Sequence, residues 1–426
     1  MTFSPASRIF GWASLVGKFG FVQVIVQTLG FAAGLILVRL MSKDDYALYT
    51  LALSALGAMA VLTDSGVGSG VSAIAGRVWS DPLRLGQLVK TAMGLRLILV
   101  AIVVLVLTPL LFFWLGEHGA KPFKAWLSAT LVACMVYFQA TNGIVGLIPK
   151  LLLQTNRIQK VDFLSGMVRL LLVCAAGLVF LDVTTALLAG LVASVFQCWL
   201  LVRLTNGDFR KDVDSDPAMR SEILGIVRKQ APNSIYFCFQ SQISVWLLGI
   251  FGSAEAIADA GALGRLAVIF TIVGNIMASI VMPRFSRCHS EKLLRLRYHQ
   301  VAGLLILALS VLALSVMCFP KQMLWILGSH YQGLEEELLL MAVAQSLGCI
   351  SGALVILNLG RGWIVSPWIA IPAGLITYTS LFLWIGASSL RHVLLVGILA
   401  SLVGIAINYA QALVCMRRMA AVGTKT

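Results

Sequence analysis

About twelve apolar runs, each about twenty residues long, fill nearly all of the 426-residue chain. A helix rises about 1.5 Å per residue, so a run of about twenty residues crosses the roughly 30 Å hydrocarbon layer of a bilayer. We therefore expect an all-α polytopic membrane protein. Its expected spans lie near residues 19–38, 47–67, 92–115, 125–149, 163–181, 185–202, 234–252, 260–282, 300–319, 338–358, 364–386 and 393–415.

The distribution of Lys and Arg predicts the orientation of these spans. The chain is 59% hydrophobic and 12% charged, with a formal net charge of +14. Most of its 32 Lys and Arg residues fall in every second gap between the apolar runs. Cytoplasmic loops carry such an excess, so both termini are expected in the cytoplasm. Anionic lipid headgroups account for the positive charge, and no nucleic-acid partner is expected.

The longest polar gap divides the spans into two equal sets. It runs over residues 205–233, with a charged first half and a mildly amphipathic second half. We expect an N-terminal six-helix lobe over 1–204, a cytoplasmic linker over 205–233 and a C-terminal six-helix lobe over 234–426. Six spans in each half predict a parallel repeat about an axis normal to the membrane.

The sequence lacks the common signatures of catalysis. It contains no GxSxG, HExxH or P-loop pattern, and its five histidines are scattered. Most outer loops are too short to hold an enzyme's extramembrane site. We therefore expect no enzyme, no catalytic residue, no metal site and no cofactor.

Asp64 is the one acidic residue that lies inside an expected span, near its inner end in LTDSGVGSG. Ion-coupled antiport needs carboxylates within the membrane. Asp64 could serve as a gate or an ion ligand. The other interpretation, a helix-end carboxylate that bonds the backbone or a neighbouring Arg, is the more common one for such a position.

Basic residues in or near the spans are more frequent than acidic ones. They are Arg265, Arg39, Arg96, Arg169 and Arg361. A charge in hydrocarbon costs several kcal/mol, so such residues face a wet cavity or a partner, or snorkel to the headgroups. These five are the candidates for contact with an anionic substrate.

Two prolines in the expected eleventh span could act in gating. Pro367 and Pro372 occur in SPWIAIPAG, and a proline inside a helix removes a backbone hydrogen bond. This stretch is expected to kink.

Several segments resemble a known family. They are LVRLMSKDDYALYTLALSALGAM at 37–59, LTDSGVGSGVSA at 62–73, GALGRLAVIF at 261–270 and ILGSHYQG at 326–333. The pattern is similar to that of polysaccharide-type flippases of the multidrug/oligosaccharidyl-lipid/polysaccharide exporter superfamily. Members commonly have an Arg after span one, an acidic–aromatic turn into span two and an Asp-x-Gly at its inner end. Here these are Arg39, Asp45-Tyr46 and Asp64-Ser65-Gly66, while Ala47 stands where the family normally has Gly.

The resemblance implies a MATE-like, V-shaped protein of two lobes in a bacterial cytoplasmic membrane. It implies a flippase that moves a polyprenyl-pyrophosphate-linked oligosaccharide from the inner to the outer leaflet by alternating access. A polysaccharide polymerase and glycosyltransferases of the same pathway would be its partners. Two alternatives stay open: an ion-coupled drug or metabolite exporter of the same superfamily, and a membrane enzyme of glycan assembly.

Overall fold

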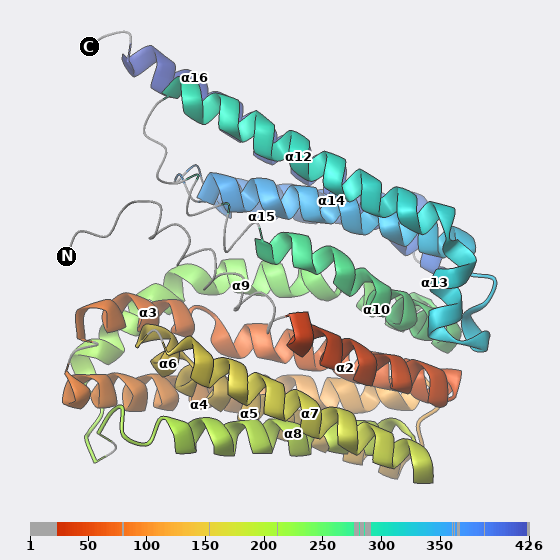
Figure 1. Cartoon of the computed structure of the whole chain (residues 1–426), viewed down its shortest axis with the longest axis horizontal. Helices are drawn as coiled ribbons and strands as arrows, with labels where there is room; N and C mark the ends of the chain where they lie inside the picture. The colour runs from red at the N-terminus through yellow and green to blue at the C-terminus, as the bar shows by residue number, and fades with distance from the viewer. Residues whose placement is uncertain are drawn as a thin grey trace, which may run out of the picture. The chain divides into compact units, whose positions relative to one another are not determined.

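The computed structural model is nearly all helical (Figure 1). It describes residues 24–78, 81–152, 154–210, 212–276, 281, 285, 291–359, 361, 363, 367–386 and 388–423. Within these residues ten helices are long and apolar enough to cross a membrane, and two shorter apolar helices cover Val24–Leu40 and Ala370–Ile385. Each of the twelve expected spans overlaps one of these helices, which confirms the expected fold class.

Contacts divide the chain into two compact units, Met1–Ile243 and Ser244–Thr426. Beside Val24–Leu40, the first unit contains α2 (Lys43–Asp64), α3 (Val67–Val78), α4 (Pro82–Glu117), α5 (Pro122–Val145), α6 (Leu147–Leu151), α7 (Thr155–Val179), α8 (Val183–Leu204) and most of α9 (Pro217–Phe251). The second contains α10 (Ala254–Ile276), α12 (Glu291–Cys318), α13 (Pro320–Leu327), the 3-10 turn η2 (Ser329–Tyr331), α14 (Glu335–Leu359), α15 (Pro367–Ile385) and α16 (Leu390–Gly423).

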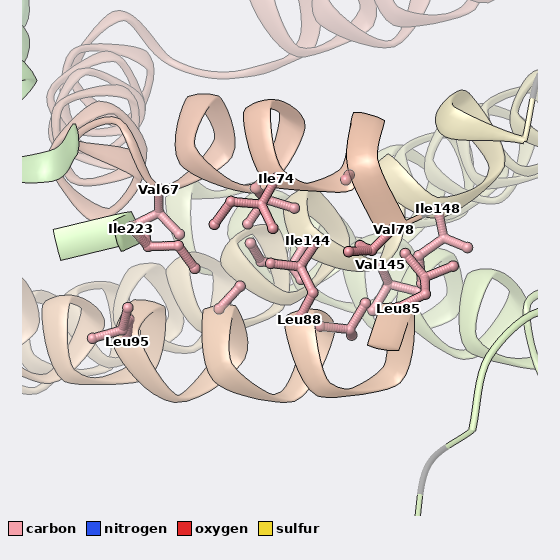
Figure 2. Packing of buried hydrophobic residues seen from close by; sticks show 14 of the residues in the cluster. Val67, Ile74, Val78, Leu85, Leu88, Leu95, Ile144, Val145, Ile148 and Ile223 are labelled. Carbon is pink, nitrogen blue, oxygen red and sulfur yellow. The ribbon is translucent and has the colours of Figure 1, made fainter. Parts of the chain in front are cut away.

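In the first unit α5 is the central helix of a bundle. It contacts α2, α4 and α8, and α7 in turn packs against α8 (Figure 1). At one end of this bundle the short helices α3 and α6 close the apolar core (Figure 2). Val67 and Ile74 of α3, Leu88 of α4, Ile144 of α5 and Ile223 of α9 are at most 2% exposed there. We call this the α3 end of the unit.

The segment expected to be a linker over 205–233 differs from that expectation. The Arg210 amide donates to the Pro82 carbonyl at 3.1 Å, and the Asp216 amide donates to Thr91 Oγ1 at 3.0 Å. Residues 217–233 belong to α9, whose helix continues without interruption into the seventh span. The division between the units lies inside α9 at Ile243, and the turns before it contact α2 through Gln242 and Cys238.

At the end of the first unit opposite α3, one lysine joins three helix starts. Lys124 Nζ lies 2.6 Å from Asp45 Oδ1 and 3.3 Å from Asp182 Oδ2. Asp45 is in the first turn of α2, and Asp182 is the N-cap of α8. A carboxylate is favourable at such a position because helix N-termini carry partial positive charge.

A similar clamp occurs in the second unit with its charges exchanged. Arg391, at the start of α16, pairs with Glu336 and Glu337 at the start of α14. In the first unit the fourth span carries the base and the sixth the acid. Among the six C-terminal spans, counted from α9, the fourth (α14) carries the acid and the sixth (α16) the base. The two clamps thus occupy corresponding places in a six-span repeat.

We predict that Lys124→Met lowers the melting temperature of the purified protein in detergent. The change leaves two carboxylates without their shared cation, a loss of about 1–2 kcal/mol for a partly buried hydrogen-bonded pair. For a unit of this size, each kcal/mol lost lowers the melting temperature by about 2–4 °C. Lys121→Met is the matched control, because Lys121 is exposed and its side chain caps no helix. Equal melting temperatures for the two variants would contradict the clamp.

The same clamp predicts acid sensitivity. Burial raises the pKa of the Asp182 carboxyl, but hydrogen bonds from Thr185 and the charge of Lys124 outweigh it and hold the pKa below its ordinary value of 3.8. A lowered folded-state pKa stabilises the protein above the unfolded pKa, and this stabilisation is lost as pH falls through the folded value. The difference between wild type and Asp182→Asn in thermal melts should therefore shrink below about pH 4.

Candidate functional site

Asp64 is the last residue of α2 and stands at a sharp turn into α3. Ser65 and Gly66 adopt positive φ values of 35° and 95°, a backbone conformation that is easy for glycine. The turn lets Asp64 Oδ1 accept the backbone N–H of Gly68 at 3.2 Å. The motif LTDSGVGSG therefore forms the tight turn between α2 and α3, and it holds the Asp64 carboxylate beside the first turn of α3.

Arg96 of α4 pairs with this carboxylate. Arg96 Nη2 lies 3.0 Å from Asp64 Oδ1, and the Arg96 side chain is 9% exposed while that of Asp64 is 41% exposed. Gly143 of α5 makes room for the guanidinium, since a Cβ at that position would lie 2.7 Å from Arg96 Nη1. The Arg96 Nε is buried without a hydrogen-bond partner in the structure. The arginine is thus held in the protein interior, and its partner faces outward.

An open depression of about 570 Å³ with a mixed polar and apolar lining lies beside Asp64. Its lining comes from two helices, Ala60, Val61 and Asp64 of α2 and Gln230, Asn233, Ser234 and Phe237 of α9. The lining offers a carboxylate, two amides, a hydroxyl and one aromatic ring. Such a wall can hydrogen-bond the polar part of an amphipathic solute and contact its apolar part. Because Arg96 compensates Asp64, the pair adds no net charge to the cavity.

The other predicted arginines do not join this pair within one unit. Arg169 of α7 donates from Nη2 to the Tyr49 hydroxyl of α2 at 3.2 Å. Arg39 is exposed in the last turn of the helix Val24–Leu40. Arg265 and Arg361 belong to the second unit: Arg265 is half-buried in α10, and the Arg361 guanidinium lies 6.0 Å from the centre of the Trp363 ring.

The two candidate gating prolines occupy different positions. Pro372 lies inside α15, as expected for a kinked span. Pro367 is the first described residue of α15, and residues 364–366 of the expected span lie outside the part of the chain that the structure describes.

Sequence reasoning missed a second acidic site in the first unit. Gln197 Nε2 of α8 donates to Asp162 Oδ1 of α7 at 3.1 Å, and Asn142 Nδ2 of α5 donates to Gln197 Oε1 at 3.2 Å. The expected span began at residue 163, but α7 begins at Thr155. Asp162 therefore lies about 10 Å along the helix. A longer span assignment, and the amides on two neighbouring spans, could have revealed it.

We predict unequal effects from breaking the Asp64–Arg96 pair. Asp64→Asn leaves the buried guanidinium without a counter-charge and should destabilise the unit by about 3–5 kcal/mol. Arg96→Met leaves a carboxylate that water can reach, so this variant should lose less stability than Asp64→Asn. The double variant should recover part of the Asp64→Asn loss. Melting temperature and monodisperse yield in detergent measure all three, and additive losses would argue against the pairing.

Comparisons with known proteins concern the fold. No protein-family model matches the sequence, and no curated protein matches it by sequence. Among solved structures, an inward-facing multidrug resistance MATE family transporter of the MOP superfamily aligns with a TM-score of 0.68 and 16% identity, over 92% of this chain and 96% of that one.

Two further structures align over similar lengths. A MATE protein in complex with MaD3S gives a TM-score of 0.64 at 18% identity, covering 93% of this chain and 94% of that one. A MOP superfamily transporter from Pyrococcus furiosus, described as having a binding pocket of reverse polarity that suggests a different function, gives 0.56 at 15%, covering 92% and 93%. The chain has the fold of the MATE transporters of the MOP superfamily.

Proposed function

We propose that this protein is an ion-coupled exporter that carries an amphipathic solute across the membrane by alternating access. The observation that carries the proposal is the MATE fold over nearly the whole chain, together with carboxylates inside its spans. The solved neighbours are described as transporters, which favours transport over a membrane enzyme of glycan assembly. The lining of the cavity beside Asp64 offers such a cargo both polar and apolar side chains.

Ion coupling needs carboxylates within the membrane-spanning helices, and the described helices contain two candidates besides Asp64. Asp162 lies in α7, and Asp259, which is 7% exposed, lies in α10. A charged carboxylate in hydrocarbon costs several kcal/mol, and binding a proton or a cation removes much of that cost. Ion binding at such a group can therefore change the relative stability of two helix arrangements.

Asp162 is our candidate for the coupling residue of the first unit. The Gln197 amide uses both of its ends, donating to Asp162 and accepting from Asn142. These two hydrogen bonds link the Asp162 carboxylate of α7 to α8 and, through Gln197, to α5. Loading or unloading an ion at Asp162 would change the strength of a hydrogen bond that joins these helices.

We predict that Asp162→Asn abolishes gradient-driven transport while the protein still folds. Asparagine keeps an oxygen for the Gln197 amide but cannot release a proton or carry a negative charge. Uptake of a fluorescent amphipathic cation into everted vesicles, driven by an imposed proton or sodium gradient, should fall about tenfold or more.

Glu222→Gln is the matched control, because Glu222 is an exposed acid that pairs with Arg77 away from the Asp162 network. Its transport rate should stay near that of wild type. If a folded Asp162→Asn variant keeps full gradient-driven transport, Asp162 is not the coupling residue.

A second candidate function is the flipping of a polyprenyl-pyrophosphate-linked oligosaccharide in a bacterial cytoplasmic membrane, with both termini in the cytoplasm. The excess of Lys and Arg over Asp and Glu favours this function: the net charge is +14, and half-buried Arg265 lies within α10. An outward-moving anion also gains about 2.3 kcal/mol per charge per 100 mV from an inside-negative potential. A polysaccharide polymerase and glycosyltransferases of the pathway would then be its partners.

This candidate predicts that Arg265→Ala slows movement of the lipid-linked oligosaccharide across reconstituted vesicles by about tenfold or more at equal protein level. Arg297→Ala, an exposed arginine of α12, is the control. The same vesicles can receive the amphipathic cation. Transport of the cation alone favours the ion-coupled exporter, and transport of the lipid-linked oligosaccharide alone favours the flippase.

A further inference from the structure

Two buried polar atoms lie on helices that pack against each other, α4 and α5. Arg96 Nε of α4 is a hydrogen-bond donor and Asn142 Oδ1 of α5 is an acceptor, and neither has a partner among the residues that the structure describes. A buried polar atom without a partner destabilises a folded protein. A water molecule both accepts and donates hydrogen bonds, so one water can satisfy these two atoms together.

Gly143, the residue after Asn142, brings the two side chains close together. A Cβ at Gly143 would lie 3.0 Å from Arg96 Cζ. Consecutive Cα atoms are about 3.8 Å apart, so the guanidinium carbon lies within about 8 Å of the Asn142 Cα. A water that makes two hydrogen bonds of about 2.9 Å bridges atoms that are about 5–6 Å apart. The positions of Arg96 and Asn142 are therefore compatible with one bridging water.

Acceptors on α8 set the orientation of the Asn142 amide. Its Nδ2 donates to the Ser194 carbonyl at 3.4 Å and to Gln197 Oε1 at 3.2 Å. A carbonyl oxygen only accepts hydrogen bonds, so the NH₂ group of Asn142 must face α8. Its Oδ1 then points away from α8, and the other long helices packed closely against α5 are α2 and α4.

The hydrogen bonds of this region run in one direction, from a cation to a carboxylate. Gln197 Nε2 donates to Asp162 Oδ1 at 3.1 Å, after accepting from Asn142. A water that accepts from Arg96 Nε and donates to Asn142 Oδ1 completes a series in which every group donates towards Asp162. Hydrogen bonds aligned in this way polarise and strengthen one another. The same guanidinium lies 3.0 Å from Asp64 on its other side.

We propose that one buried water bridges Arg96 Nε and Asn142 Oδ1 and joins Asp64 and Asp162 into a single hydrogen-bonded network. The charge of Arg96 then stabilises two carboxylates, Asp64 beside the cavity and Asp162 in α7. An ion that neutralises Asp162 weakens this second interaction, so Arg96 holds Asp64 more tightly and leaves it less available to a solute in the cavity. Ion and solute thereby disfavour each other's binding. The bridge rests on the contacts above, and its role in coupling rests on the proposed function.

A relocated carboxylate tests the bridge without any transport assay. Asp64→Asn removes the counter-charge of Arg96 and lowers the melting temperature. Adding Asn142→Asp places a new carboxylate one water away from the guanidinium, and it should recover about a third or more of the lost melting temperature. Thr141→Asp is the matched control. Two residues along an α-helix are about 200° apart, so Thr141 faces away from the side of α5 where Gly143 meets Arg96, and this change should recover nothing.

Monodisperse yield in detergent replaces the melting temperature if the Asp64→Asn protein does not fold. Recovery of yield by Asn142→Asp and not by Thr141→Asp then supports the bridge.

Equilibrium binding tests the role of the network in coupling. The probe is the fluorescent amphipathic cation, and its affinity is measured on purified protein in detergent. Asp162→Asn imitates the neutral, ion-loaded carboxyl and should weaken binding about fivefold or more. Arg96→Lys keeps a positive charge beside Asp64 but has no Nε–H group, so in this background the same change should weaken binding less than about twofold.

The bridge and its role can fail separately. If neither Asn142→Asp nor Thr141→Asp improves the Asp64→Asn protein, or if both improve it equally, the bridge is wrong. An experimental density map in which Arg96 Nε and Asn142 Oδ1 point away from each other would also overturn it. If the effect of Asp162→Asn on probe affinity persists in Arg96→Lys, or is missing from the otherwise wild-type protein, the network does not couple the two sites.

A third result separates this inference from the proposed function. Recovery by Asn142→Asp in a protein that binds no probe would retain the bridge and reject the exporter.

Discussion

The buried guanidinium of Arg96 is the charge around which the α3 end of the first unit is arranged. An unpaired cation is very unfavourable in a low-dielectric interior, so Arg96 needs a carboxylate and a space of the right shape. Asp64 supplies the first at 3.0 Å, and the bare Cα of Gly143 supplies the second. Asp64 is the last residue of α2, and the left-handed turn at Ser65 and Gly66 leads directly into α3.

In each half of the chain, counted in six spans from Val24–Leu40 and from α9, polar contacts hold the fourth and sixth spans together. At one end, Lys124 binds the α8 cap, and an acidic pair on α14 binds Arg391 of α16. Near the other end, Asn142 Nδ2 donates to the Ser194 carbonyl, and Asn358 Nδ2 donates to the Asn408 carbonyl. Within lipid the hydrophobic effect does not draw apolar helices together, so polar contacts and close packing fix their pairing.

The spans and the transporter fold were accessible to sequence reasoning, whereas the sites were accessible only in part. Hydrophobic length is a local property, so each expected span has its helix. Asp64 and Arg96 could be named as candidates, but the sequence gives no sign that these two are partners. Asp162 was missed because α7 begins eight residues before the expected span, and a polar helical turn looks like a loop in sequence.

The sequence by itself determined how many times the chain can cross a bilayer and where charge accumulates, because both follow from composition along a single segment. Tertiary structure alone decided which carboxylate meets which guanidinium and which amides hold Asp162. It also brought Arg210, Asp216 and Ile223, all within the expected linker over 205–233, into contact with the first unit's other helices. These outcomes depend on contacts between residues far apart in the chain, and the low dielectric of the interior makes each polar contact decisive there.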